Sequence, residues 1–206
     1  MPNWKTHIEI GNTLRNYLKF NDEEFELFSI GNIAPDINNS FMIKDISKKI
    51  NHAVTHFSDN GKTYEIFYNK YKQYMNNPFI LGYYIHLFTD YTWNNNYYER
   101  LKKEGIDISK DCDNLRIIKQ HDFRMYNNKF IDNTIQLNNI ENIVENSKII
   151  EEISLTKEDI QKTKRFLDEK IKEEGIFEFY KMEELDNLFK QTTEIIKSQN
   201  YVDKSK

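Results

Sequence analysis

Cysteine is almost absent from the sequence, since Cys112 is the only one among 206 residues. A single cysteine excludes an internal disulfide and a thiolate zinc cluster, and it gives no sign of an oxidising compartment. The sequence also lacks a run of roughly 20 apolar residues, the length that a membrane span needs. Its first residues contain no apolar segment of the kind found in secretory signals. We therefore expect a cytoplasmic protein with no transmembrane segment.

An excess of positive charge is missing as well. The formal net charge is -4, with 29 Lys and Arg against 33 Asp and Glu, and the two signs are interspersed along the chain. Proteins that bind a nucleic-acid backbone generally carry a basic surface that neutralises its phosphates. The charge balance therefore predicts no nucleic-acid partner.

Glycine and proline are scarce, at six and three residues. Apolar residues recur mostly three and four positions apart, which is the spacing of an amphipathic helix. The length fits one domain, and the aromatic share of 14% predicts a core filled largely by rings. We predict an all-α, single-domain multi-helix bundle over residues 1–206. Residues 1–131 would carry a metal site, and the more charged residues 132–206 would form supporting helices.

Local signals predict where the helices begin and end. Asn21 and Thr156 each precede an acidic residue by three positions, which resembles a capping box. Pro78 fits the first position of a long helix, where a missing N–H costs least. Loops are predicted for 31–42 and at Asn60. The predicted helices are 4–18, 22–30, 63–75, 78–103, 112–131, 137–152, 157–173 and 182–198.

The stretch LGYYIHLFTD is apolar enough to lie in the core, yet it contains His86 and Asp90. Residues four apart share one face of a helix, so this pair could bind one metal ion. Taken alone, a buried histidine bonded to the aspartate one turn away is the commoner arrangement.

Three further segments are also weak signals when each is taken alone. Asp36 follows Pro35, which is ordinary turn chemistry. His52 and His56 would face the same way on a helical turn, and His7 could simply pack among aromatic rings. Together with the pair above, however, these imidazoles and carboxylates supply what a metal site of nitrogen and oxygen ligands needs.

The absence of thiolates defines the kind of metal site that the sequence predicts. Zinc fits the ligand types best, with manganese or iron as alternatives, and one or two ions are expected. Such a site would be hydrolytic and would keep a coordination position for water.

Four pieces of the sequence, in this order, resemble the zinc-dependent phospholipase C superfamily, which also includes single-strand-specific zinc nucleases. They are WKTHIEI, GNIAPDI, THFS and LGYYIHLFTD, and they span roughly residues 4–93. The chain looks particularly like a short, signal-less bacterial branch of that superfamily, described only as hydrolases.

The resemblance implies a role for five residues of this sequence. His7, Asp36, His56, His86 and Asp90 match metal ligands of the family. Asp36 matches the aspartate to which activation of the attacking water has been assigned, and Asp90 matches one that bridges two metals.

The sequence also departs from the family pattern. In the secreted enzymes an N-terminal Trp binds metal through its own amine and carbonyl, whereas Trp4 is internal. The family's later group of two His and one Glu is reduced here to His121, with Asp122 beside it. A complete trinuclear cluster is therefore not expected, and His52 either adds a ligand or packs nearby.

These features predict a metal-dependent phosphoesterase that acts through a zinc-activated water. Its substrate would be a small phosphoester or a lipid headgroup. One alternative is a helical domain of the same fold that is catalytically incomplete and serves a binding or structural role. Another is an HD-type phosphohydrolase built on His86, His121, Asp122 and Asp132, which leaves GNIAPDI and THFS unexplained.

Overall fold

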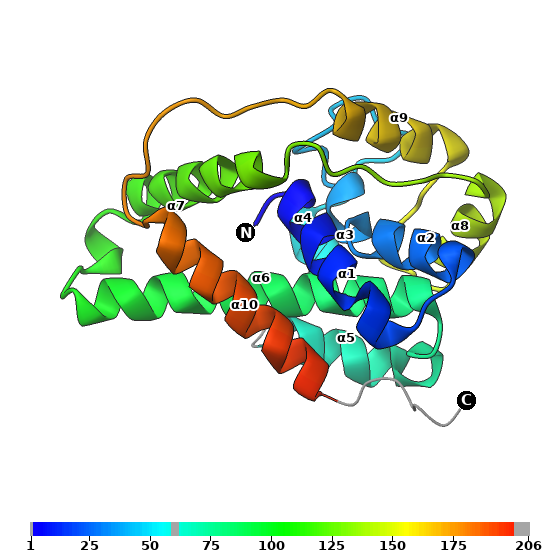
Figure 1. Ribbon diagram of the computed structural model, residues 1–206, viewed down its shortest axis with the longest axis horizontal. Coiled ribbons are helices and arrows are strands. Elements are labelled where there is room, and N and C mark those ends of the chain that lie inside the picture. Colours follow the sequence, from blue (N-terminus) through cyan, green and yellow to red (C-terminus); the bar gives the residue numbers. More distant parts are fainter. Residues whose placement is uncertain (1, 59–61, 200–206) are drawn as a thin grey trace.

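The computed structural model describes residues 2–58 and 62–199. All regular structure within these ranges is helical, with no strand (Figure 1), so the predicted all-α fold is confirmed. The α-helices are α1 (Trp4–Leu18), α2 (Asp22–Gly31), α3 (Ala34–Ile37), α4 (His52–Thr55), α5 (Thr63–Tyr71), α6 (Pro78–Lys103), α7 (Cys112–Asn127), α8 (Ile140–Ser147), α9 (Lys157–Asp168) and α10 (Met182–Ser198). Three 3₁₀ turns are η1 (Lys72–Tyr74), η2 (Ile108–Lys110) and η3 (Asn128–Phe130).

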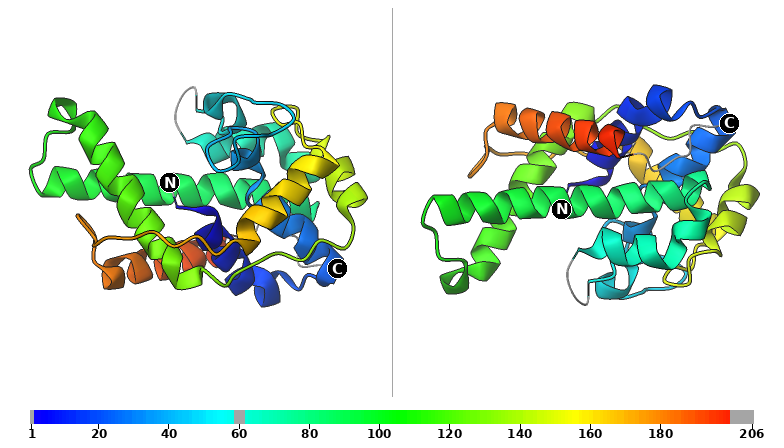
Figure 2. Two further views of the ribbon diagram at one scale, coloured as in Figure 1. Left: turned by 90° about the horizontal axis from the view of Figure 1, so that it is seen from above. Right: turned by 90° about the horizontal axis from the view of Figure 1, so that it is seen from below.

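Helix α6 runs along the long axis of the molecule, and the other helices pack around it (Figures 1 and 2). α2 and α5 lie against its N-terminal half. Every residue from Phe79 to Asp90 is buried. A helix that is covered on all sides places in the core any polar side chain that it carries. This packing explains why the polar groups of His86 and Asp90 lie inside the protein.

The contact between α2 and α6 depends on two glycines. A Cβ added to Gly82 would lie 2.2 Å from the carbonyl oxygen of Phe28, and one added to Gly31 would lie 2.1 Å from that of Phe79. Only a residue without a side chain permits so close an approach of two backbones. The approach brings the end of α2, and with it Asn32, against the face of α6 that carries His86.

Several helix ends agree with the sequence signals. Both predicted capping boxes are present, at the start of α2 with Asn21 and at the start of α9 with Thr156. Pro78 is the first residue of α6, and the side chain of Asn77 caps that helix by accepting the N–H of Phe79.

Other boundaries differ from the prediction. Segment 31–42 was expected to be a loop but contains the single turn α3, because Pro35 lies at the start of a helix, where its missing N–H is not needed. Helices α8 and α9 are shorter than predicted. The loop predicted at Asn60 lies outside the described residues.

The buried apolar residues form two clusters that meet at Phe189. The larger cluster surrounds the N-terminal half of α6, and the smaller one surrounds Trp93 and Tyr97 further along the same helix. A single domain, with residues 132–206 in a supporting role, stays a prediction. Within the described ranges, no helix combines the length and apolarity needed to cross a bilayer.

Candidate metal centre

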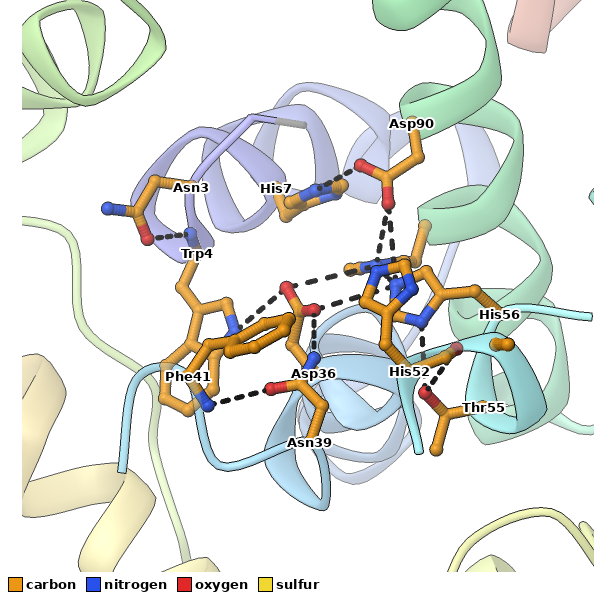
Figure 3. Close-up of polar contacts among 12 residues, drawn as sticks. Asn3, Trp4, His7, Asp36, Asn39, Phe41, His52, Thr55, His56 and Asp90 are labelled. Atoms are coloured by element: carbon orange, nitrogen blue, oxygen red, sulfur yellow. Dashed lines mark hydrogen bonds and ion pairs between the residues drawn. The ribbon is translucent and has the colours of Figure 1, made fainter. Parts of the chain in front are cut away.

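Five side chains from four parts of the chain face one another in the core, and Figure 3 labels His7, Asp36, His56 and Asp90 among them. His7 comes from α1 and Asp36 from α3, while His56 directly follows α4. His86 and Asp90 come from the buried half of α6. All five are buried.

Asp90 lies at the middle of this group. Its Oδ1 lies 3.3 Å from Nε2 of His7, and its Oδ2 lies 3.3 Å from Nε2 of His86 and 3.5 Å from Nε2 of His56. Despite these short distances, both Asp90 oxygens and both ring nitrogens of His7 lack a hydrogen bond of acceptable geometry. Buried polar atoms are normally hydrogen-bonded, so unpartnered atoms at this density indicate a missing ligand.

Asp36 lies across the group from Asp90 and is held by two donors. Nε1 of Trp4 donates to its Oδ2 at 3.2 Å, and Nδ2 of Asn39 donates to its Oδ1 at 2.8 Å. Its Oδ1 also lies 3.5 Å from Nε2 of His56. The carboxylate is thus oriented by neighbours while one side faces the imidazoles.

The hydrogen bonds of two histidines fix which ring nitrogen carries the proton. Nδ1 of His86 lies 2.9 Å from the carbonyl oxygen of Asn32, which can only accept. Nδ1 of His56 lies 2.9 Å from the hydroxyl of Thr55, and that hydroxyl donates its own hydrogen to the carbonyl of His52. Both Nδ1 atoms are therefore donors, and in the neutral rings both Nε2 atoms carry lone pairs.

These two Nε2 atoms lie 3.2 Å apart, and each also faces the Asp90 carboxylate. Lone pairs that face one another and a carboxylate in the core repel unless a cation lies among them. Donors of this type, nitrogen from histidine and oxygen from carboxylate, are the usual zinc ligands outside thiolate sites. The side chains present therefore fit a metal ion.

Burial and neighbouring charge shift the pKa values of the group. Burial, with the repulsion of His86, lowers the pKa of His7 to about 4. Burial, with His56, lowers the pKa of His52 to about 4. Burial acts in the same direction on His86, but the carboxylates of Asp90 and Asp36 outweigh it and raise the pKa of that imidazole. For Asp90, burial alone would raise the pKa, and the facing histidines hold it well below the usual range.

A family model described as zinc dependent phospholipase C matches residues 6–174. This span exceeds half of the chain. The protein belongs to the zinc dependent phospholipase C family. The membership confirms the resemblance found in residues 4–93 and extends it beyond them. No curated protein and no solved structure matches the chain significantly.

Membership in the zinc dependent phospholipase C family supports a phospholipase C-like hydrolase. Together with the cluster of His and Asp side chains, it also supports a metal cofactor. Two groups of three residues have ligand atoms that all lie within 4.8 Å of one another. One group is His7, His86 and Asp90, and the other is Asp36, His52 and His56.

Two further ligand candidates from the sequence, His121 and Asp122, have hydrogen-bond partners outside the metal centre in this phospholipase C-like fold. Nε2 of His121 lies 3.0 Å from the carbonyl oxygen of Ile176. Asp122 accepts three backbone N–H groups, from Glu178, Phe179 and Tyr180. Both residues thus anchor the segment before α10, and neither belongs to the two ligand groups.

The four residues of the HD-type alternative do not converge on one site in this structure. Its fourth member, Asp132, forms an ion pair with Lys170 on the surface. His86 and His121 have unrelated surroundings, since His86 faces Asp90 in the core while His121 lies beside Glu173. A His-Asp dipeptide in the sequence was therefore a misleading signal.

Sequence reasoning missed the residues that orient the ligands. Thr55 and Asn39 each lie within three positions of the ligand that they hold, so a neighbour search around each candidate could have found them. Asn32 acts on His86 through a backbone carbonyl, and no residue type signals that role. Trp4 was considered only as an absent amine ligand, whereas its indole holds Asp36.

Proposed function

We propose that this protein is a metal-dependent phosphoester hydrolase. His7, Asp36, His56, His86 and Asp90 would form its metal centre. The observation that carries the proposal is the convergence of three buried Nε2 atoms on the unpartnered carboxylate of Asp90. Buried polar groups normally have their hydrogen bonds satisfied, whereas both ring nitrogens of His7 and both carboxylate oxygens of Asp90 have no partner.

Each residue has a distinct part in the proposed reaction. When bound, zinc supplies a Lewis acid and lowers the pKa of a water molecule to about 7. His7, His56, His86 and Asp90 would hold the ion. Asp36 accepts the proton of the attacking water, and the donors Trp4 and Asn39 keep its carboxylate in one orientation.

The hydrogen-bond partners of His86 and His56 support the same assignment. The carbonyl of Asn32 and the hydroxyl of Thr55 fix the rings of His86 and His56 with Nε2 turned inward. Such partners commonly hold the histidines of a metal site in the tautomer that binds.

The expected substrate is a phosphoester, either a small phosphodiester or a lipid headgroup. The segment between Asp36 and His52 supports this class. Phe41 is 68% exposed next to the His52 ring, and three lysines of the segment are exposed in a protein of net charge -4. A segment that carries an exposed ring and exposed basic side chains suits an anionic ester with an apolar part.

The test is a substrate panel on zinc-loaded protein, with the chelator-treated protein as control. The panel contains phosphatidylcholine and phosphatidylglycerol vesicles, bis(p-nitrophenyl) phosphate and p-nitrophenyl phosphate. We expect metal-dependent hydrolysis of at least one diester, which Asp36→Asn reduces at least about 100-fold.

A second candidate function is a metal-binding domain without catalysis. It is favoured by the reduction of the family's later His, His and Glu group to His121, whose ring has another partner. Protein that carries a full metal load and hydrolyses none of the four substrates would support this candidate over the hydrolase.

A further inference from the structure

We infer that Lys119 of α7, together with Asn94 and Tyr98 of α6, forms a binding site for a phosphate-type oxyanion. The site shares no residue with the metal centre and does not depend on the proposed hydrolase activity. The inference starts from a buried positive charge. Lys119 is only 5% exposed, whereas a lysine is almost never fully buried in a protein unless it is paired with an anion.

The buried ammonium of Lys119 has no anionic partner. In the part of the chain that the structure describes, no carboxylate forms an ion pair with it. Asp122 lies one turn further along α7, but its carboxylate accepts three backbone N–H groups from the segment before α10. Burial of an ammonium without a counter-charge is costly. The surroundings of Lys119 therefore favour an anion that comes from outside the chain.

Neutral groups surround the ammonium. Its Nζ donates to Oδ1 of Asn94 at 2.8 Å and to the hydroxyl oxygen of Tyr98 at 3.2 Å. The same atom lies 4.7 Å from the centroid of the Tyr98 ring and 5.5 Å from that of the Tyr97 ring. Ring faces and neutral acceptors attract a cation. None of them cancels its charge.

These contacts leave hydrogen-bond donors in excess. An ammonium has three N–H groups and no acceptor, so one N–H of Lys119 remains after its bonds to Asn94 and Tyr98. Within the described ranges, the amide N–H groups of Asn94 and the O–H of Tyr98 also have no acceptor. Tyr98 is 38% exposed and Asn94 is half-buried, so a solute can reach both. A cation beside free donors is what an oxyanion needs for charge-assisted hydrogen bonds.

The two helices hold these side chains together without help from a ligand. Asn94 and Tyr98 are four positions apart on α6 and therefore share one face of it. Between them, Tyr97 donates its hydroxyl to the carbonyl of Leu115 at 2.8 Å, which ties α6 to α7 one turn before Lys119. The residues Trp93, Tyr97 and Leu101 of α6 and Phe123 and Tyr126 of α7 share the smaller apolar cluster. The donors are thus preorganised.

The donor set also indicates the class of ligand. The free donors come from three side chains on two helices, and they include an ammonium, a hydroxyl and an amide. A phosphate group presents several oxygens in different directions, so more than one of these donors can bind it at once. Inorganic phosphate and the phosphate of a monoester share this chemistry, and the test separates the two sources.

The test is a titration of the chelator-treated protein with inorganic phosphate, followed by NMR of the backbone amides at constant ionic strength. We expect saturable shifts around Lys119 that sodium chloride does not reproduce. Lys119→Met removes the charge, keeps the length of the side chain, and should weaken phosphate binding at least about 10-fold. Lys148→Met is the matched control, because it removes the same charge from a side chain that is 64% exposed. It should bind phosphate as the wild type does.

Asn94→Asp is the sharper variant, because it supplies a carboxylate within the chain and keeps the shape of the side chain. A carboxylate at this position attracts the ammonium of Lys119 and repels an oxyanion. The variant should therefore have a higher thermal midpoint than the wild type without phosphate, and it should lose phosphate binding. Glycerol 3-phosphate is titrated in parallel. Tighter binding than that of inorganic phosphate would assign the site to a phosphate monoester, and weaker binding would assign it to free phosphate.

Three results would overturn the inference. They are shifts in the wild type that do not saturate, shifts that sodium chloride reproduces, and equal phosphate affinity in the wild type and Lys119→Met. If Lys119→Met fails to fold, Asn94→Asp and Tyr98→Phe are measured instead, and wild-type phosphate affinity in both would also overturn it. The chelator-treated protein carries no metal, so all of these results leave the hydrolase proposal untouched.

Discussion

Nε2 of His56 and Nε2 of His86 face one another at 3.2 Å in the core, and the outward nitrogen of each ring is held by a separate acceptor. In the neutral rings these two lone pairs repel one another, and a cation between them would relieve that repulsion. The relationship thus links the stability of the protein to the presence of metal.

His86→Ala should abolish the stabilisation by metal. A ligand that binds only the native state raises its stability, by about 4 kcal/mol at a concentration 1,000 times its Kd. Zinc should therefore raise the thermal midpoint of the wild-type apoprotein by several degrees and leave that of His86→Ala unchanged. Scanning calorimetry with and without zinc measures both shifts. A zinc-dependent rise in the variant equal to that of the wild type would refute His86 as a ligand.

Trp4→Phe should slow hydrolysis without loss of metal. The substitution keeps an aromatic ring against Phe166 and removes only the Nε1–H that holds Asp36. One hydrogen bond to a charged group contributes about 1.5–3 kcal/mol, so kcat should fall roughly 10- to 100-fold. Trp93→Phe is the matched control, because Trp93 is equally buried and its Nε1 has no partner. An equal loss of kcat in both variants would indicate a packing effect instead.

Thr55→Val should weaken zinc binding. Valine has nearly the shape of threonine but cannot accept the Nδ1–H of His56, which Thr55 accepts at 2.9 Å. Loss of such a partner typically lowers metal affinity 10- to 100-fold, and we expect about that change. Competition with a chromophoric chelator measures the Kd. Thr55→Ser, which keeps the hydroxyl, should bind zinc about as tightly as the wild type, and a serine variant as weak as the valine one would contradict this mechanism.

The sequence predicted those features of the fold that depend on near neighbours. The capping boxes at Asn21 and Thr156 and the start of α6 at Pro78 involve residues within one turn, so their signals are local. Segment 31–42 was misjudged because a proline that ends one helix can also begin the next, as Pro35 does in α3. Nothing local distinguishes these two uses.

The residues of the candidate centre could be proposed from the sequence, but their arrangement in space could not. The spacing of His86 and Asp90 placed both on one helix face, and the resemblance supplied the other members. His121 and His52 looked alike in the sequence, since each lies in or beside a hydrophobic segment. Only the packing of distant segments separates them, because it turns His121 toward Ile176 and stacks His52 on His56.

Asp159→Asn should destabilise the protein at neutral pH and less so in acid. Burial would raise the pKa of Asp159, but hydrogen bonds from Ser47 and Thr156 outweigh it and lower the pKa. A carboxyl whose pKa is lowered by folding stabilises the protein above its ordinary pKa of about 4, and this stabilisation is lost as the pH falls through the lowered value.

Urea unfolding of wild type and Asp159→Asn at neutral pH and near pH 3 tests this linkage. The free energy of unfolding of the variant should be about 1–3 kcal/mol below that of the wild type at neutral pH, and this difference should be smaller in acid. Asp45→Asn, on a side chain that is 95% exposed, should change stability by less than about 0.5 kcal/mol. An equal difference in free energy of unfolding at both pH values would mean that the ionised carboxylate of Asp159 is not the stabilising species.

Gly82→Ala should lower both the stability of the protein and its affinity for zinc. An added Cβ at Gly82 would lie 2.2 Å from the carbonyl oxygen of Phe28 and 2.8 Å from the backbone nitrogen of Asn32, so α2 must move away from α6. Overpacking of this kind typically costs about 1–3 kcal/mol. The same movement lengthens the bond between Nδ1 of His86 and the carbonyl of Asn32, which fixes the ligand tautomer.

Gly11→Ala is the control for that substitution. Its added Cβ would meet only the ring of Phe28, at 3.2 Å, and the side-chain amide of Asn32, at 3.5 Å. Side chains can adjust by such small amounts where a backbone cannot, and alanine favours the helix by about 1 kcal/mol over glycine. Gly11→Ala should therefore be close to wild type in its free energy of unfolding, measured with urea, and in its zinc affinity, measured by chelator competition. If Gly82→Ala is destabilised but binds zinc as tightly as the wild type, the contact between α2 and α6 does not affect metal binding. The Asn32 carbonyl would then not be needed to orient His86.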